Sequence, residues 1–353
     1  MSLLRLAYTA ASIESILDLL GLFAPSTLTT FVNSCAPKFA LAQPATASTV
    51  FTSKDNLIRQ IVQDFLNDVH YIQPDIPQNN RLVQDVLSEL KSWNIQDGRP
   101  WTFYIKVAEH SAGMAELSYH HHPYAVKKQI AMFTVFMLYM DDLADRMPDA
   151  LSDFQRRMIF GLPQLNPVLE HFPTHLTGFY DFYDPLCANS IVAAALEYVT
   201  GTALETRREM STMPPHPDAT SWPYFLRAKT GVAPAYAFMI FYGDRHSNIS
   251  YFLQTIPDIN AFIDLTNDVL SFYKEERAGE SHNYLHNRAR CRGATALSTC
   301  AEVAKECAVL DERISKVSAT TALKTLEAWK TFKTGYITFH VALPRYRLAE
   351  IGI

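Results

Sequence analysis

The sequence has few cysteines for its length, five among 353 residues, and none of them forms a C-x-x-C pair. An odd number without paired spacing predicts neither a disulfide framework nor a zinc module. Unpaired thiols are typical of a reducing compartment. We therefore expect a cytoplasmic protein.

Long hydrophobic runs are also missing. No stretch of about 18 apolar residues is free of charge, so no transmembrane helix is predicted. Residues 1–50 carry few charges, but Glu14 and Asp18 interrupt their apolar run. This pattern suits neither a secretory signal nor an acid-poor transit peptide, although a targeting signal stays the alternative. We expect residues 1–55 to form a partly helical extension and residues 56–353 a single domain.

Charge of one sign is not concentrated anywhere in the chain. The net charge is −5 and no block of like charges occurs, which gives no general attraction to nucleic acid or anionic membranes. A polyanionic ligand would therefore need a local site or metal ions. The hydrophobic content of 48% is ample for a large buried core.

Helical periodicity dominates what is present. Apolar residues recur every four positions in the segments 56–69 and 81–93 and every three in 323–332, which is typical of amphipathic helices. Alternating strand patterns are scarce, and proline-containing connectors separate the helical segments. The sequence therefore predicts an all-α fold. The first segment is expected to bury one face, made of Leu57, Ile61, Phe65 and Val69.

An acidic cluster follows the most apolar segment. Residues 130–140 are apolar all round, which predicts a helix buried on every side. Directly after it come Asp141, Asp142 and Asp145. On a continuing helix Asp141 and Asp145 would share one face, and their position next to a buried segment favours a cavity that binds cations such as Mg²⁺. Asp142 would point elsewhere and pair with a basic side chain. A solvated helix end is the alternative.

A second oxygen-rich pattern lies on a predicted helix over residues 258–277. Asn267, Ser271 and Glu275 are spaced four apart and form one stripe along it. An amide, a hydroxyl and a carboxylate can together chelate one Mg²⁺ and leave room for phosphate oxygens. An ordinary polar helix face is the alternative.

Basic and phenolic groups complete the pattern. Arg227, Lys274, Arg345 and Tyr346 could donate to a departing anion, since leaving groups are stabilised by cations and donors placed where charge develops. Each of the charged groups, taken singly, could equally be a surface charge or part of a structural ion pair.

The two acidic patterns resemble the metal-binding motifs of class I terpene synthases. DDLAD at 141–145 looks like their DDxxD motif, and NDVLSFYKE at 267–275 looks like their (N/D)DxxSxxxE motif. The run NDVLSFYKEE, followed by RYRL, is similar to the fungal trichodiene synthase family with its longiborneol-forming relatives. The resemblance covers roughly residues 95–353.

This resemblance implies a single helical bundle around a deep apolar pocket, three Mg²⁺ ions and an allylic isoprenoid diphosphate, specifically farnesyl diphosphate, as the substrate. It also implies a homodimer. Asp141 would bind two of the ions with support from Asp145, and the third would be held by the second motif. Arg227 matches the diphosphate-sensing arginine, and the other diphosphate contacts would come from Lys274, Arg345 and Tyr346. The stretch 228–231 lacks the acidic linker of many relatives, which puts a helix-break trigger there in doubt.

The expected chemistry is ionisation of the diphosphate and cyclisation of the carbocation to a sesquiterpene. Aromatic faces stabilise cations by about 0.5–2 kcal/mol each. Candidates to line the cavity are Phe133, Phe136, Tyr139 and Phe272, with plain core packing as the alternative.

Three competing functions are kept. A chain-elongating isoprenyl synthase also begins with DDxxD, but it usually carries a second aspartate-rich motif in place of the Asn/Ser/Glu stripe. A non-catalytic isoprenoid-binding protein could retain the pocket. Finally, the run His120–His122 could bind a transition metal, although consecutive helical histidines point in different directions.

Overall fold

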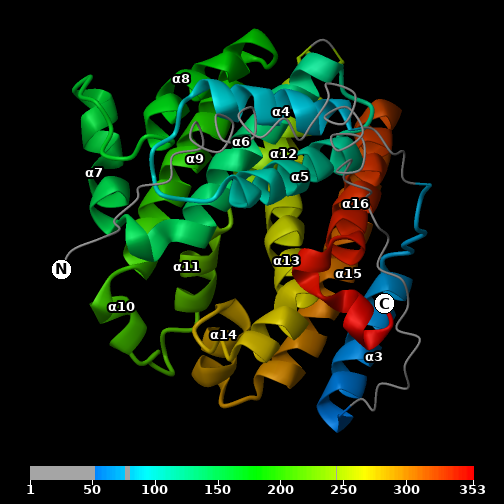
Figure 1. The fold of residues 1–353 in the computed structure, drawn as a ribbon. Coiled ribbons are helices and arrows are strands. Elements are labelled where there is room, and N and C mark those ends of the chain that lie inside the picture. Colours follow the sequence, from blue (N-terminus) through cyan, green and yellow to red (C-terminus); the bar gives the residue numbers. More distant parts are fainter. Residues whose placement is uncertain (1–51, 76–79, 244) are drawn as a thin grey trace, which may run out of the picture. The chain divides into compact units, whose positions relative to one another are not determined.

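The computed structural model describes residues 52–75, 80–243 and 245–353. Apart from Asn80, these residues belong to one compact unit. All regular elements of the described ranges are helices, so the predicted all-α class is confirmed (Figure 1). Residues 1–51 of the predicted extension 1–55 lie outside the described residues. The first described helix begins at Ser53.

The α-helices are α3 (Ser53–Asp68), α4 (Arg81–Ser92), α5 (Trp101–Ser118), α6 (Tyr124–Leu143), α7 (Pro148–Ile159), α8 (Phe172–Thr177), α9 (Pro185–Glu205), α10 (Arg208–Thr212), α11 (Trp222–Thr230), α12 (Ala233–Met239), α13 (Ile256–Ala278), α14 (Tyr284–Arg292), α15 (Ala296–Thr321) and α16 (Leu323–Ala342). The short 3₁₀ helices are η1 (Ala144–Arg146), η2 (Leu169–His171), η3 (Gly178–Asp181), η4 (Ile249–Tyr251), η5 (Leu253–Thr255), η6 (Pro344–Tyr346) and η7 (Leu348–Ile351).

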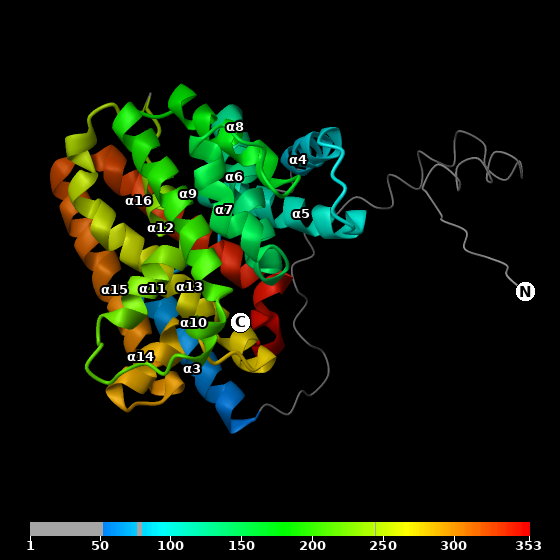
Figure 2. The same ribbon diagram turned by 90° about the vertical axis from the view of Figure 1, so that its left-hand side faces the viewer.

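The long helices pack as a closed series. Helix α6 packs on α5, α5 on α16, α16 on α13, α13 on α12, α12 on α9, and α9 again on α6. Helix α15 covers α13 and α16 from outside, and α3 packs on α15 (Figure 1 and Figure 2). The helices that carry the two acidic patterns, α6 and α13, therefore belong to the same series.

Local sequence signals explain where the site helices begin and end. Helix α13 stops at Gly279, which adopts a left-handed conformation (φ 76°) that glycine tolerates without a Cβ clash. Helix α14 starts at Asn283, whose side chain accepts a hydrogen bond from the backbone N–H of His286. The loop between them is short, so α14 lies beside the end of the α13 stripe.

The predicted buried faces are partly confirmed. In α4 the predicted residues Leu82, Val86 and Leu90 are fully buried, and the segment 130–140 lies within the buried part of α6. In α3 the prediction is half wrong, because Leu57 is 53% exposed and Ile58 and Val62 are buried with Phe65 and Val69. A strict spacing of four drifts around a helix of 3.6 residues per turn, whereas the buried residues are spaced four, three and four apart.

Two glycines let helices approach closely. A Cβ on Gly335 of α16 would lie 1.9 Å from the backbone oxygen of Leu117 in α5, and one on Gly201 of α9 would lie 2.5 Å from the backbone oxygen of Lys229 in α11. No real side chain tolerates such distances. The positions of α16 against α5 and of α11 against α9 therefore depend on the absence of a side chain.

Candidate active site

One cavity collects most of the predicted site residues. It has a volume of about 470 Å³ and is bounded by α5, α6, α9, α11, α12, α13, α16 and η6. The predicted residues that line it are Asp141, Arg227, Asn267, Lys274, Glu275, Arg345 and Tyr346. Ser271 is buried behind Glu275, and Asp145 lies in an adjoining recess.

The end of α6 is held by an arginine from the C-terminal region. Arg345 Nη2 lies 2.7 Å from Asp141 Oδ2 and 3.1 Å from Asp142 Oδ1. The expectation that Asp142 pairs with a basic side chain is thus confirmed. The side chain of Asp141 is still 58% exposed, so it is open to a further ligand.

Asp145 does not continue the α6 face. The helix ends at Leu143 and Asp145 lies in η1, so the expectation of a shared helix face with Asp141 is wrong. Both side chains nevertheless line a recess of about 420 Å³ next to the main cavity.

Glu205, at the end of α9, lines the same recess and was missed by the sequence reasoning. Enclosure by the protein and repulsion from Asp141 raise the pKa of Glu205 to about 7. No local pattern marks this residue, because it joins the acidic cluster from a distant helix. The recess thus holds more carboxylate than the DDLAD segment alone supplies.

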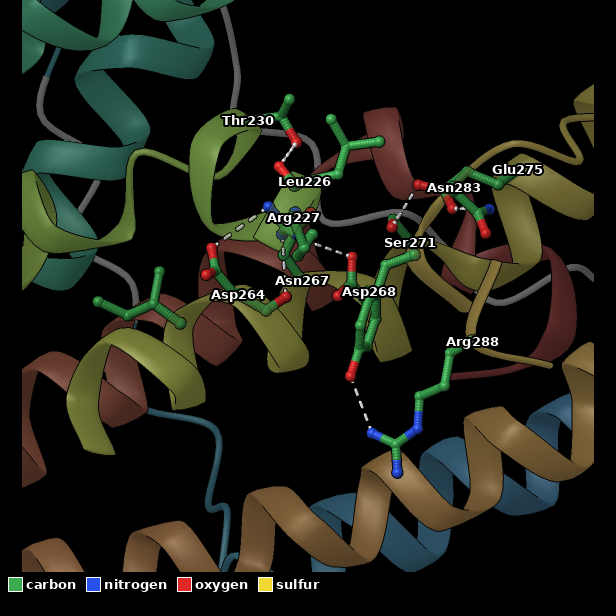
Figure 3. A network of polar contacts seen from close by, with 12 residues as sticks. Leu226, Arg227, Thr230, Asp264, Asn267, Asp268, Ser271, Glu275, Asn283 and Arg288 are labelled. Carbon is green, nitrogen blue, oxygen red and sulfur yellow. Dashed lines mark hydrogen bonds and ion pairs between the residues drawn. The ribbon is translucent and has the colours of Figure 1, made fainter. Parts of the chain in front are cut away.

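The α13 stripe is organised by hydrogen bonds to Glu275. Ser271 Oγ donates to Glu275 Oε1 at 2.6 Å, and Asn283 Nδ2 donates to Glu275 Oε2 at 2.7 Å (Figure 3). Burial raises the pKa of Glu275 to about 7 despite the nearby Lys274. Asn283 also caps α14 and gave no signal in the sequence beyond that of a helix start.

Arg227 reaches from α11 onto α13. Its Nε lies 2.8 Å from Asp268 Oδ1, its Nη1 3.2 Å from Asp264 Oδ1, and its Nη2 donates to Asn267 Oδ1 at 3.2 Å (Figure 3). Burial raises the pKa values of both carboxyl groups above their ordinary range, and the guanidinium opposes that rise. Asp264 was not singled out from the sequence, since nothing local connects it to Arg227.

The backbone turns sharply next to Arg227. Helix α11 ends at Thr230 with Gly231 as its C-cap, and α12 begins directly after Val232, a β-branched residue in the left-handed region at φ 49°. Pro234 cannot continue a helix from α11 because it lacks an N–H group. A Cβ on Gly231 would lie 1.9 Å from Asp264 Oδ1 and 2.4 Å from Arg227 Nη1, so any other residue here would displace this ion pair.

His340 is a further residue that the sequence reasoning missed. It is 1% exposed and lines the cavity from α16, and its ring contacts that of Tyr346 with centroids 4.3 Å apart and planes tilted by 41°. Its Nε2 lies 3.1 Å from Asn267 Nδ2, and its Nδ1 lies 2.7 Å from the backbone oxygen of Tyr336. Lys274 Nζ lies 5.6 Å from the ring centroid of Tyr346.

The family model for trichodiene synthase (TRI5) matches residues 104–352, which contain all of these groups. The chain belongs to the trichodiene synthase family. The predicted family is thereby confirmed, and with it the prediction that the protein is a terpene synthase. Membership of the trichodiene synthase family also implies the use of a divalent metal ion and an isoprenoid diphosphate substrate.

Relatives within the trichodiene synthase family are fungal terpene synthases. Terpene synthase BipA of Cochliobolus sativus is 32% identical over 82% of this chain and 88% of its own. Monoterpene synthase 25 of Postia placenta is 29% identical over 91% and 95% of the two chains. Longiborneol synthase of Gibberella zeae is 29% identical over 94% and 96%.

The fold of this trichodiene synthase family member is similar to that of a solved bacterial enzyme. Linalool/nerolidol synthase from Streptomyces clavuligerus superposes with a TM-score of 0.57 over 76% of this chain and 96% of that chain, at 13% identity. The helical bundle expected from the sequence is thus the fold of a terpene synthase.

The donor set suits a hard divalent cation. Asp141, Asn267 and Glu275 all present oxygen atoms to one cavity, and hard cations prefer oxygen ligands. Within residues 52–75, 80–243 and 245–353, no three His, Cys, Asp or Glu side chains are grouped closely enough to hold a metal themselves. A metal ion here would therefore also need amide, hydroxyl or diphosphate oxygens.

For the four candidate cavity aromatics, the alternative of plain core packing is confirmed. Phe133, Phe136, Tyr139 and Phe272 are fully buried in the core and do not line the cavity. Helix α6 is apolar all round, so its sequence does not reveal which face meets the cavity; that face carries Thr134, Met137, Leu138 and Asp141. The aromatic rings that line the cavity come from other helices and from η6: Tyr198, Tyr236, Tyr336, Phe339 and Tyr346.

Two further findings concern the histidine run 120–122 and membrane spans. His122 Nε2 lies 2.8 Å from the backbone oxygen of Met239 and lines a separate, small cavity. No helix in the described part of the chain is long and apolar enough to cross a membrane.

Proposed function

We propose that this terpene synthase catalyses the Mg²⁺-dependent ionisation and cyclisation of farnesyl diphosphate to a sesquiterpene, with release of diphosphate. One observation carries the proposal. A single cavity has oxygen ligands from α6 and α13 and basic groups from α11, α13 and η6, together with an apolar wall.

The metal ions would be held at two places. Asp141, with Asp145 and Glu205 in the adjoining recess, would hold two Mg²⁺ ions. Asn267, Ser271 and Glu275 would hold the third, because they lie on one stripe of α13. When bound, Mg²⁺ neutralises negative charge that develops on the departing oxygen.

The diphosphate would be bound by Arg227, Lys274, Arg345 and Tyr346, which line the cavity next to both ligand sets. Both arginines are paired with carboxylates of the protein. We expect them to exchange these partners for phosphate oxygens, since guanidinium groups bind phosphate and carboxylate in the same geometry.

The hydrocarbon chain would be folded against the apolar wall. Leu138 and Val232 offer no nucleophile, and the rings of Tyr236 and Phe339 can stabilise positive charge. The wall would also exclude water, which prevents premature quenching of the carbocation.

The substrate length is the finer part of the proposal. The subgroup resemblance favours the C15 diphosphate, whereas the name of the Postia placenta relative makes the C10 diphosphate the competing substrate. A chain-elongating synthase is disfavoured by the α13 stripe, and a non-catalytic protein by intact oxygen ligands at both places.

The test is incubation of the purified protein with geranyl, farnesyl and geranylgeranyl diphosphates, with and without Mg²⁺, followed by gas chromatography–mass spectrometry. We expect a Mg²⁺-dependent sesquiterpene from farnesyl diphosphate. Asp141→Asn and Asn267→Ala should abolish it, whereas Asp149→Asn, an exposed aspartate at the start of α7, should not. Folded protein that leaves all three substrates intact with Mg²⁺ present would overturn the proposal.

A further inference from the structure

Asn267 lies in a short series of hydrogen bonds. The group at one end of the series can only donate, and the group at the other end can only accept. At one end Arg227 Nη2 faces Asn267 Oδ1 at 3.2 Å. At the other end His340 Nδ1 faces the backbone oxygen of Tyr336 at 2.7 Å. Between them, Asn267 Nδ2 and His340 Nε2 are 3.1 Å apart.

The donors and acceptors in this series allow a single assignment. A guanidinium only donates, so the Asn267 atom that faces Arg227 must be the amide oxygen. The other amide atom is then the nitrogen, which donates to His340 Nε2. A carbonyl only accepts, so the imidazole proton must be on Nδ1, which leaves Nε2 as the acceptor that the amide requires.

We infer that His340 is a positioning residue for the α13 metal site, and that it is the reason for asparagine in place of aspartate at position 267. The inference rests on the proposed function of Asn267 as a metal ligand. His340 holds the amide nitrogen, so the oxygen stays turned toward the cavity even when Arg227 leaves it for diphosphate. An aspartate would place a second oxygen against the lone pair of Nε2, where two acceptors repel each other.

The burial of His340 makes this hold rigid. Its side chain is 1% exposed and is packed against the rings of Tyr336, Phe339 and Tyr346. The imidazole therefore cannot turn its Nδ1–H toward Asn267 without losing the Tyr336 carbonyl. Turning the ring would leave the buried Nδ1–H without an acceptor, which costs free energy. The flipped Asn267 amide would need the turned ring, so the same cost disfavours it.

The test compares substitutions that keep or remove the acceptor. Glutamine reaches about as far as histidine Nε2 and can either accept or donate, so His340→Gln should support both asparagine and aspartate at position 267. His340→Phe supports neither. The readout is Mg²⁺-dependent binding of inorganic diphosphate by isothermal titration calorimetry, with circular dichroism to verify folding. His246→Phe is the matched control, because His246 is 2% exposed and lies outside the cavity.

We expect His340→Phe to weaken diphosphate binding about tenfold, the usual effect of losing one buried hydrogen bond, while His340→Gln and His246→Phe stay within about threefold. Asn267→Asp should also weaken binding, and the double variant Asn267→Asp/His340→Gln should regain part of it. The inference is overturned if His340→Phe binds like wild type, or if the double variant is no better than Asn267→Asp. Absence of binding by the wild-type protein would overturn the proposed function itself.

Discussion

At the scale of single residues, the ligand groups of the cavity are occupied by charges of the protein itself. Arg345 pairs with Asp141, and Arg227 pairs with Asp264 and Asp268 while donating to Asn267. These pairs keep buried and half-buried carboxylates compensated without a bound cation. Because these residues are paired with one another, a small displacement of one side chain also displaces its partners.

Gly231→Ala tests this tight arrangement. The new Cβ would lie 1.9 Å from Asp264 Oδ1, so the ion pair with Arg227 has to move. We expect a loss of unfolding free energy of about 2 kcal/mol or more, as for overpacked buried sites, and a loss of activity of at least about tenfold. Urea denaturation and product assays measure both. Gly161→Ala, where no atom lies within 4 Å, should lose about 1 kcal/mol through its positive φ and keep its activity. Equal effects at the two positions would contradict the clash.

The raised pKa of Glu275 predicts a pH dependence of stability. Its pKa is about 7 in the folded protein, above the ordinary value of about 4.3 in an unfolded chain. The folded state then binds more protons between these values, so the stability of the metal-free protein falls as the pH rises through this window. In Glu275→Gln this contribution is absent. We expect the variant to gain stability relative to wild type between pH 5 and pH 8, by about 2–3 kcal/mol.

Urea denaturation in the presence of a chelator measures this difference. Glu327→Gln, the same substitution at an exposed glutamate, is measured alongside as the control for loss of a carboxylate. A Glu275→Gln difference that is constant with pH would mean that the carboxyl group titrates normally.

At the scale of helices, α3, α15 and α16 are joined by one buried ionic cluster. Lys333 Nζ lies 2.6 Å from Asp311 Oδ2 and donates to the backbone oxygen of Val69 at 2.8 Å, and Trp329 Nε1 donates to Asp311 Oδ1 at 2.9 Å. Lys333 is 8% and Asp311 7% exposed. This cluster positions α16, which carries His340 on its cavity side.

Lys333→Met should therefore be strongly destabilising. It leaves Asp311 buried without a counter-charge, and breaking a buried pair in this way costs about 3–5 kcal/mol. Denaturant unfolding measures the loss. The control is Lys316→Met, which breaks the exposed pair with Glu312 and should cost less than about 1 kcal/mol. A small effect of Lys333→Met would show that water or another group compensates Asp311.

At the scale of the whole molecule, metal and diphosphate should bind together. Diphosphate alone would be repelled by the carboxylates that line the cavity and the recess: Asp141, Asp142, Asp145, Glu205 and Glu275. Mg²⁺ alone would have to compete with the arginines for these carboxylates. We expect Mg²⁺ and inorganic diphosphate each to raise the melting temperature little, and both together to raise it by several degrees, as binding to the folded state requires. Differential scanning fluorimetry measures this. A full shift with diphosphate and a chelator would contradict the requirement for metal.

Much of the architecture could be predicted from local sequence. The parts that could not be predicted all depend on which helices meet in the folded chain. The α13 stripe follows from spacing alone, and so do α4 and the buried segment of α6. Glu205 and His340 join the site from distant parts of the chain, and no local pattern records which helices meet. Asn283 lies only a short loop away from α13, but its sequence signal is that of a helix start alone. The core packing of the candidate cavity aromatics was equally hidden, because a helix apolar on all sides has no periodicity that identifies its cavity face.

The two ends of the cavity differ in how freely they can change during evolution. Gly231 and Gly201 are closely approached by atoms of neighbouring helices, and Arg227, Asp264 and Asp268 are paired so that replacing one would strand the others. Among the residues that the structure describes, no hydrogen bond or ion pair holds the side chains of Met137 and Leu138 in the wall, and methionine tolerates substitution well. Descendants of this enzyme can therefore acquire new products through the wall, while the diphosphate end is inherited unchanged.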